Sequence, residues 1–205
     1  MKHAKTSKTW IKEHGNDFYV KQAKKDGYRS RAAYKLLEIA ERNQLLKPGM
    51  AVVDLGAAPG SWSQVAIQKV GRKGKVVALD LLEMAPLEAV DFIQGDFRDT
   101  CILNALEEKL ANRLLDLVIS DMSPNVSGIG ISDQARSIHL AELALAFSME
   151  RLNPDGNFLV KVFQGRDFEQ LVCSARTGFQ KVIIRKPKAS RSRSKELYLL
   201  GLGKK

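Results

Sequence analysis

Cysteine is scarce in this 205-residue sequence: Cys101 and Cys173 are the two present, and they lie in separate segments. Their spacing matches neither a disulfide framework nor a zinc site, so we expect a reduced, cytoplasmic protein without a bound metal. No apolar run approaches the roughly 20 residues that span a bilayer, and the basic N-terminus lacks the apolar segment of a signal peptide. The sequence therefore argues against a membrane or secreted protein.

Acidic residues are scarce at both ends of the chain. Residues 1–35 hold ten Lys and Arg against three Asp and Glu, and residues 181–205 hold nine against one, whereas the residues between carry a net charge of −5. Clustered basic residues neutralise phosphates, and aromatic residues that can stack on bases are interleaved with the N-terminal charges. This distribution favours a nucleic-acid partner over the alternative of two solvated tails.

From residue 50 onward, strand patterns alternate with helical patterns. The expected strands cover residues 50–56, 75–80, 90–96, 114–121, 157–163, 181–187 and 196–203. The expected helices cover residues 30–46, 61–70, 99–113, 132–152 and 166–177. This order predicts an α/β fold with a doubly wound, mostly parallel seven-stranded sheet. Because no helix separates the last two strands, at least one pairing there should be antiparallel.

A glycine turn, DLGAAPGSW at residues 54–62, joins the first strand to the next helix. Its glycines allow the backbone to approach a ligand closely, and the helix presents its N-terminal amides. The turn lacks the dinucleotide-binding spacing, because Ala58 and Ser61 stand where glycines are required, and the chain has no GxxxxGK[ST] loop. The turn therefore suits a nucleotide-like ligand without a pyrophosphate, such as S-adenosylmethionine.

Two further aspartates extend this candidate cofactor site. Asp80 ends the second strand, where a carboxylate can accept hydrogen bonds from both hydroxyls of a ribose. Asp96 follows the third strand and is a candidate acceptor for the adenine amino group. The alternative for Asp96 is an acid that caps the next helix.

A lysine interrupts the most apolar strand. Lys161 lies within NFLVKVFQG, and an unpaired ammonium in a protein core is costly. Asp121 follows the neighbouring fourth strand and could pair with it; the alternative is a lysine that extends its ammonium to solvent from the strand end. Lys35 and Glu196 also interrupt apolar patterns, although each alone is more often a solvated charge.

Seven segments, taken in order, resemble the FtsJ/RrmJ (RlmE) family of heat-shock-associated ribosomal RNA 2′-O-methyltransferases, which have a Rossmann-like class I methyltransferase fold. The segments are YRSRAAYKLLEI, DLGAAPGSW, ALDLLEM, QGDFRD, SDMSPN, VKVFQG and SRSRSKELYLL. The resemblance implies methylation of a uridine ribose in the A loop of 23S rRNA, within the 50S subunit or a late precursor, with S-adenosylmethionine as cofactor. It also divides the chain into a basic extension, residues 1–28, and a methyltransferase domain, residues 29–205.

The resemblance implies roles for individual residues. A catalytic tetrad of the family falls on Lys35, Asp121, Lys161 and Glu196. The cofactor contacts fall on Gly60, Trp62 (through its backbone), Asp80, Asp96 and Asp121. Ser61 departs from the family pattern, which has a second glycine at this position.

A ribose hydroxyl is a poor nucleophile until its proton is removed or strongly engaged. The sequence leaves open whether Lys161 accepts this proton as a neutral amine or engages the hydroxyl as a cation. It also leaves open a tRNA or other RNA 2′-O-methyltransferase, and an RNA-binding assembly factor without turnover. A nicotinamide oxidoreductase is disfavoured by the glycine spacing. No pattern indicates an assembly larger than a monomer.

Overall fold

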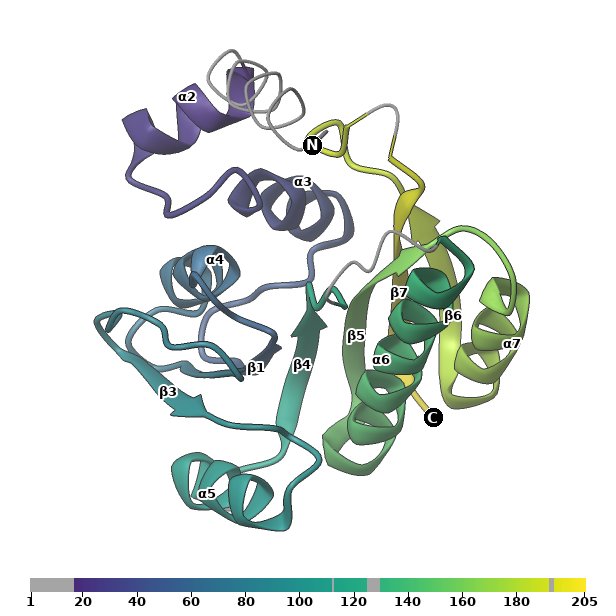
Figure 1. Ribbon diagram of the computed structural model, residues 1–205. Helices are drawn as coiled ribbons and strands as arrows, with labels where there is room; N and C mark the ends of the chain where they lie inside the picture. Colours follow the sequence, from purple (N-terminus) through teal and green to yellow (C-terminus); the bar gives the residue numbers. More distant parts are fainter. Residues whose placement is uncertain (1–16, 112, 125–129, 192–193) are drawn as a thin grey trace, which may run out of the picture.

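The computed structural model describes residues 17–111, 113–124, 130–191 and 194–205 (Figure 1). Within these residues, seven strands form one sheet in the order β3-β2-β1-β4-β5-β7-β6. The strands are β1 Ala51–Leu55, β2 Lys75–Asp80, β3 Val90–Gln94, β4 Leu115–Ser120, β5 Leu152–Phe163, β6 Phe179–Arg185 and β7 Glu196–Lys204. Strands β1 to β5 pair in parallel, whereas β7 is antiparallel to both β5 and β6. The predicted doubly wound, Rossmann-like sheet with an antiparallel last strand is confirmed.

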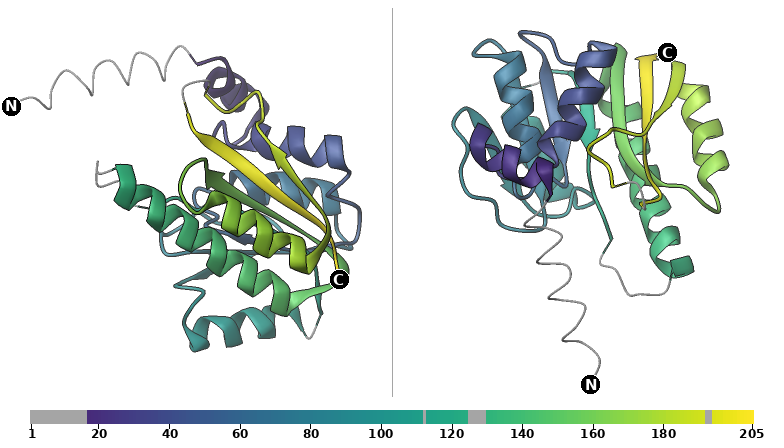
Figure 2. Two further views of the ribbon diagram at one scale, coloured as in Figure 1. Left: turned by 90° about the vertical axis from the view of Figure 1, so that its right-hand side faces the viewer. Right: turned by 90° about the horizontal axis from the view of Figure 1, so that it is seen from above.

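Helices cover both faces of this sheet (Figures 1 and 2). They are α2 Phe18–Asp26, α3 Ala33–Asn43, α4 Ser61–Val70, α5 Thr100–Leu110, α6 Gly130–Arg151 and α7 Phe168–Gly178. Apolar residues of α5, α6 and α7 form the core on one face, and those of α3 and α4 form the core on the other. The strands are apolar on both faces because both are covered; all five residues of β1, for example, are buried. No helix in the described part of the chain is long and apolar enough to cross a membrane.

One helix, α2, was not predicted from the sequence. Most of its residues are polar, so the apolar periodicity on which we relied did not indicate a helix. The residues at its two ends are nevertheless typical helix caps. The Asp17 carboxylate accepts a hydrogen bond from the Tyr19 N–H (3.0 Å) as an N-cap, and Gly27 ends the helix with a φ of 76°. Residues 1–16 of the predicted basic extension lie outside the described residues.

Strand β5 begins earlier than predicted. Leu152 already pairs with Leu115, and the next pair along the two strands joins Asn157 to Leu117. The intervening NPDG segment, expected as a turn between helix and strand, is therefore a bulge within β5. Asp155 in this bulge has a φ of 63°, a left-handed conformation that aspartate tolerates better than most residues.

The direction of β7 determines what gathers at one edge of the sheet. The carboxyl ends of β1, β2, β4 and β5 share this edge because these strands are parallel. Since β7 runs the other way, its first residue, Glu196, pairs with Phe163 at the end of β5. Residues from the start of one strand and the ends of four others therefore meet there.

Candidate active site

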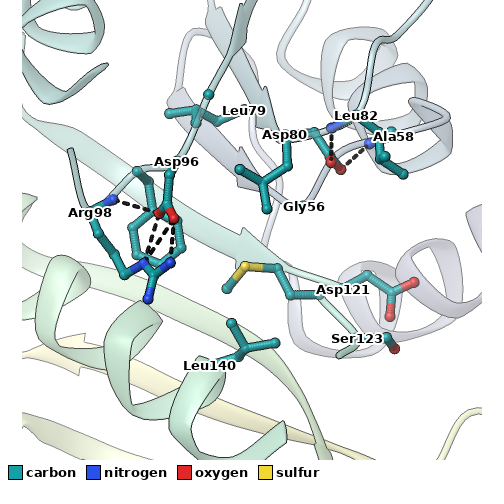
Figure 3. A pocket seen from close by; sticks show the side chains of 14 residues that line it. Gly56, Ala58, Leu79, Asp80, Leu82, Asp96, Arg98, Asp121, Ser123 and Leu140 are labelled. Carbon is teal, nitrogen blue, oxygen red and sulfur yellow. Dashed lines mark hydrogen bonds and ion pairs between the residues drawn. The ribbon is translucent and has the colours of Figure 1, made fainter. Parts of the chain in front are cut away.

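A cavity of about 330 Å³ opens at this edge, where strand order reverses between β1 and β4 (Figure 3). Ligands of open α/β sheets bind at this switch point. The lining includes Gly56, Asp80, Leu82, Asp96, Arg98 and Asp121. Three of the predicted cofactor residues, all aspartates, thus share one cavity, whereas Gly60 and Trp62 are not part of its lining.

Asp80 fixes the cavity wall through its carboxylate. One oxygen accepts a hydrogen bond from the Ala58 N–H and the other from the Leu82 N–H, each at 2.8 Å. These bonds tie the glycine turn to the segment after β2, as Figure 3 shows. Each carboxylate oxygen can accept a second hydrogen bond, so both remain available to ligand hydroxyls. The exposed side chains of Leu81 and Leu82 add apolar surface beside the carboxylate.

Asp96 and Arg98 lie across the cavity from Asp80 (Figure 3). The Asp96 carboxylate accepts hydrogen bonds from the guanidinium and from the backbone N–H of Arg98 (3.0 Å). The side-chain hydrogen bond from Arg98 lowers the pKa of Asp96, which keeps the carboxylate ionised. Asp96 does not cap α5; Asp99 occupies the N-cap position, without a side-chain capping bond.

Arg29, which was not predicted from the sequence, supports the glycine turn from outside. Its guanidinium donates hydrogen bonds to the carbonyls of Pro59 (2.8 Å), Ala85 (2.7 Å) and Pro86 (2.7 Å). Gly60 has a φ of 103°, and a Cβ there would lie 2.8 Å from this guanidinium. The glycine is thus required by both its backbone conformation and this close approach.

The side chains of the first two residues of α4 are buried and form hydrogen bonds within the protein. The Ser61 hydroxyl lies 2.7 Å from the Ser30 hydroxyl. The serine at this position, where we expected a glycine, therefore makes a hydrogen bond to the segment before α3. The Trp62 indole is buried and donates to the Ala32 carbonyl at 2.9 Å. Because the Trp62 side chain is occupied in this way, only its backbone is free for the ligand contact that we predict.

The four charged residues of the predicted tetrad form two ion pairs. Lys161 Nζ lies 3.1 Å from Asp121 Oδ1 and also donates to the Asp121 backbone carbonyl at 2.5 Å. Lys35 Nζ lies 2.8 Å from Glu196 Oε1. Lys161 is only 7% exposed, so its ammonium is held by its partner and not by solvent. The structure thus brings together residues from α3, β5, β7 and the end of β4.

Tyr198 stands between the two ion pairs. Its hydroxyl lies 3.0 Å from Asp121 Oδ1 and 3.1 Å from Glu196 Oε1, and its ring is fully buried. Tyr198 is directly opposite Lys161 in the β5–β7 pairing. Tyr198 was not predicted from the sequence, although strand alternation places it on the same face as Glu196, two residues earlier.

Burial and neighbouring charges have opposite effects on the pKa of Glu196. Burial alone would raise the pKa of its carboxyl, but the Lys35 ammonium, the Ser190 hydroxyl at 2.8 Å and the Lys161 ammonium together lower it. Glu196 is therefore an ionised carboxylate inside a largely buried cluster. Removing Lys35 would leave this charge without its cation, which is far costlier than removing a surface ion pair.

Asp54, on β1 beneath the glycine turn, is another residue at this site that was not predicted from the sequence. It is fully buried; one carboxylate oxygen accepts from the Ser63 hydroxyl at 2.6 Å, and within the described structure the other has no hydrogen-bond partner. Burial, together with the nearby Asp121 and Asp80 carboxylates, raises the pKa of Asp54 to about 7. Asp54 is therefore only partly ionised at neutral pH.

A Rossmann-like sheet with β7 antiparallel between β5 and β6, and with carboxylates in its switch-point cavity, is the arrangement expected of a Rossmann-like methyltransferase. The profile of the FtsJ-like methyltransferase family matches residues 28–204, and the chain belongs to this family. The predicted family is thereby confirmed.

Curated relatives agree with this assignment. The chain is 64% identical to the ribosomal RNA large subunit methyltransferase E of Nitrosospira multiformis over 205 residues, with both chains fully covered. It is 58% identical to the protein of the same name from Chromobacterium violaceum, again with full coverage of both.

Solved structures agree as well. A ribosomal RNA methyltransferase from Plasmodium falciparum superposes with a TM-score of 0.78 and 31% identity, covering 86% of this chain and 98% of that one. Fibrillarin from Aeropyrum pernix, solved with bound S-adenosyl-L-methionine, has a TM-score of 0.54 and 14% identity, with 83% and 76% covered. The fibrillarin likeness shows the fold alone.

The raised pKa of Asp54 predicts an unusual pH dependence of stability. Between its ordinary value of 3.8 and about 7, Asp54 keeps a proton in the folded protein that the unfolded chain has released. The free energy of unfolding should therefore fall as pH rises through this window, by at most about 1.4 kcal/mol per pH unit from this group. Asp54→Asn, which retains an acceptor for Ser63, should flatten this fall in urea unfolding series.

The control is Asp99→Asn, which removes an exposed carboxylate at the start of α5 and should keep the wild-type slope. Equal slopes for the wild type and Asp54→Asn would contradict the prediction.

Proposed function

We propose that this protein transfers a methyl group from S-adenosylmethionine to the ribose 2′-hydroxyl of a uridine in the A loop of 23S rRNA. The substrate is the 50S subunit or a late precursor, and the enzyme acts in the cytoplasm as a monomer. The observation that carries the proposal is the position of Asp121, which lines the cavity and also pairs with the buried Lys161. One residue thereby joins a cofactor-sized cavity to a lysine suited to engage a hydroxyl.

The residues around the cavity fit S-adenosylmethionine. Its volume of about 330 Å³ lies within the range of small-molecule sites, roughly 300–1,000 Å³. Asp80 would accept the ribose hydroxyls and Asp96 the adenine amino group, and Asp121 would contact the remainder. Gly60 and Trp62 are not part of the cavity lining; in our proposal they contact the ligand as well, Trp62 through its backbone. An acidic lining also suits a ligand that carries an amine and a sulfonium. When bound, the cofactor supplies the activated methyl group.

On the reacting side, the chain's own residues hold and orient the hydroxyl. The ribose oxygen takes the methyl group and loses its proton. As a neutral amine, Lys161 Nζ accepts that proton; as an ammonium, it donates a hydrogen bond to the ribose oxygen and the proton passes to solvent. In both cases the Asp121 carboxylate orients Lys161. Lys35 and Glu196 complete the substrate pocket beside them. Burial of the Lys161–Asp121 pair strengthens these interactions, because charges in a site without water are weakly screened.

The RNA assignment rests on the relatives and on the charge distribution. The curated relatives are named ribosomal RNA large subunit methyltransferases. The two basic ends of this chain meet beside the tetrad, since the Arg31 guanidinium of the N-terminal part bonds both the Asp17 carboxylate and the Ala189 carbonyl. Exposed Lys24 and Lys25 at the end of α2 extend the basic surface for phosphates.

Cofactor identity can be tested by ligand-induced stabilisation. S-adenosylmethionine at about 100 times its Kd should raise the free energy of unfolding by about 2.7 kcal/mol, whereas NADH should not stabilise the protein. Asp80→Asn should weaken S-adenosylmethionine binding about 10-fold or more, because a charged acceptor is lost. Glu150→Gln, on the exposed end of α6, is the control and should bind normally. Stabilisation by NADH instead would rule out the cofactor assignment.

Lys161→Ala should reduce methyl transfer at least about 100-fold, because the group that engages the hydroxyl proton is gone. Binding of S-adenosylmethionine, measured by calorimetry, should survive, since Lys161 is not part of the cavity lining. Lys69→Ala removes an exposed lysine from α4 and should retain full activity. Near-normal turnover of Lys161→Ala would sink the proposed role.

The substrate can be identified with cofactor labelled in its methyl group. We expect label in 50S subunits, little in 30S subunits or tRNA, and a modified uridine ribose in the A loop when the product is mapped. Label in tRNA alone would overturn the substrate assignment. Cofactor binding without label in any RNA would instead indicate an assembly factor that does not turn over.

A further inference from the structure

The Tyr198 hydroxyl faces two carboxylate oxygens at once, Asp121 Oδ1 at 3.0 Å and Glu196 Oε1 at 3.1 Å. A hydroxyl has one proton, so it makes one good hydrogen bond to an ionised carboxylate at a time. The two acceptors belong to different ion pairs, one with Lys161 and the other with Lys35. The two carboxylates therefore share one donor.

Tyr198 keeps this proton. Burial, with the nearby Asp121 and Glu196 carboxylates, raises the pKa of its hydroxyl well above the usual value, so the group is a neutral donor at any working pH. Its ring is also fixed: it packs against the Trp62 ring, 5.8 Å between centroids, and lies 5.7 Å from Lys35 Nζ. What can change is therefore the direction of the O–H bond, not the position of the oxygen.

The direction of this bond alters both ion pairs. When the hydroxyl donates to Asp121, it stabilises that carboxylate and loosens its hold on the Lys161 ammonium. When it donates to Glu196, the Asp121 carboxylate loses this hydrogen bond and interacts more strongly with the Lys161 ammonium. Any event at the Lys35–Glu196 pair, such as contact with substrate, thus changes how tightly Lys161 is held.

We propose that Tyr198 is a positioning residue that couples the Lys35–Glu196 pair to the Lys161–Asp121 pair, so that the four charged residues act as one unit. The inference rests on the proposed methyl transfer for its kinetic consequence, but the coupling itself is a property of the folded chain. Residues of such a shared hydrogen-bond network show non-additive effects when they are changed together.

The first test is Tyr198→Phe, which removes the hydroxyl and keeps the buried ring. The kcat for methyl transfer to 50S subunits should fall about 10-fold or more, because Asp121 and Glu196 lose the bond that orients them. The KM for S-adenosylmethionine should stay within about 2-fold of the wild type. Ser148→Ala, which removes a fully buried hydroxyl of α6 bonded to the Ala144 carbonyl, is the control and should leave kcat unchanged. A kcat of Tyr198→Phe equal to that of the wild type would overturn the positioning role.

The second test is a double-mutant cycle with Glu196→Gln. In a chain that keeps Tyr198, Glu196→Gln removes one of the two carboxylates, so the O–H bond turns toward Asp121. In a chain that already carries Tyr198→Phe there is no O–H bond to turn, so Glu196→Gln cannot act on Asp121 in this way. The combined loss of kcat should therefore be at least about 3-fold smaller than the product of the two separate losses. Losses that simply multiply would refute the coupling.

The same cycle, measured as the free energy of unfolding in urea, separates this inference from the proposed function. If the wild type methylates no RNA, the proposed function fails, and the unfolding cycle still decides the coupling. Non-additive stability changes would support a shared hydroxyl, and additive changes would refute it.

Discussion

A buried ammonium is the constraint on which this site depends. Lys161 lies in the middle of the sheet, where a charge without a partner would destabilise the fold by several kcal/mol. The partner has to come from a neighbouring strand, and β4 supplies it through Asp121. Once that pair is buried, the second carboxylate nearby also needs a cation, which α3 provides as Lys35. The pairing of β4 with β5 and the placement of α3 thus keep both buried charges paired.

The cavity is held by a different kind of interaction. Around the cavity, two side chains fix backbone: Asp80 binds two N–H groups and Arg29 binds three carbonyls. In the predicted tetrad, side chains fix one another through two ion pairs and the Tyr198 hydroxyl. Asp121 belongs to both parts, because it lines the cavity and pairs with Lys161. Loss of Asp121 would therefore disturb both sides at once, whereas loss of Asp80 would disturb one.

Much of the fold was predictable because strong local patterns carry it. Helix α4 and strand β2 have the predicted bounds, since apolar runs between glycine and aspartate turns leave little choice. Strand β5 was predicted five residues short because its pairing with β4 resumes across a bulge, a long-range contact with no local sign. Helix α2 was missed because its polar sequence lacks periodicity, although Asp17 and Gly27 mark its ends.

The candidate site likewise contains residues that could be predicted from the sequence and residues that could not. Charges that interrupt apolar patterns, such as Lys161, are visible in the sequence because burial makes them exceptional. Tyr198 was missed because a tyrosine in a strand is ordinary, and its importance lies in which two oxygens its hydroxyl meets. Arg29 and Arg98 were missed because arginine near a chain end or in a loop usually faces solvent. Such roles depend on tertiary contacts that spacing cannot supply.

The place of β7 in the sheet has a consequence for the order of assembly. β7 lies between β5 and β6 but follows both in the sequence, and within the described residues β6 pairs with β7 alone, so β6 has no partner in the sheet until β7 is present. Glu196 and Tyr198 belong to β7. Until β7 pairs with β5, the edge of β5 that carries Lys161 has no neighbouring strand on that side. Contacts between such distant segments form slowly. Every residue that lines the cavity precedes β7 in the chain, whereas the predicted tetrad is complete only once β7 has been made.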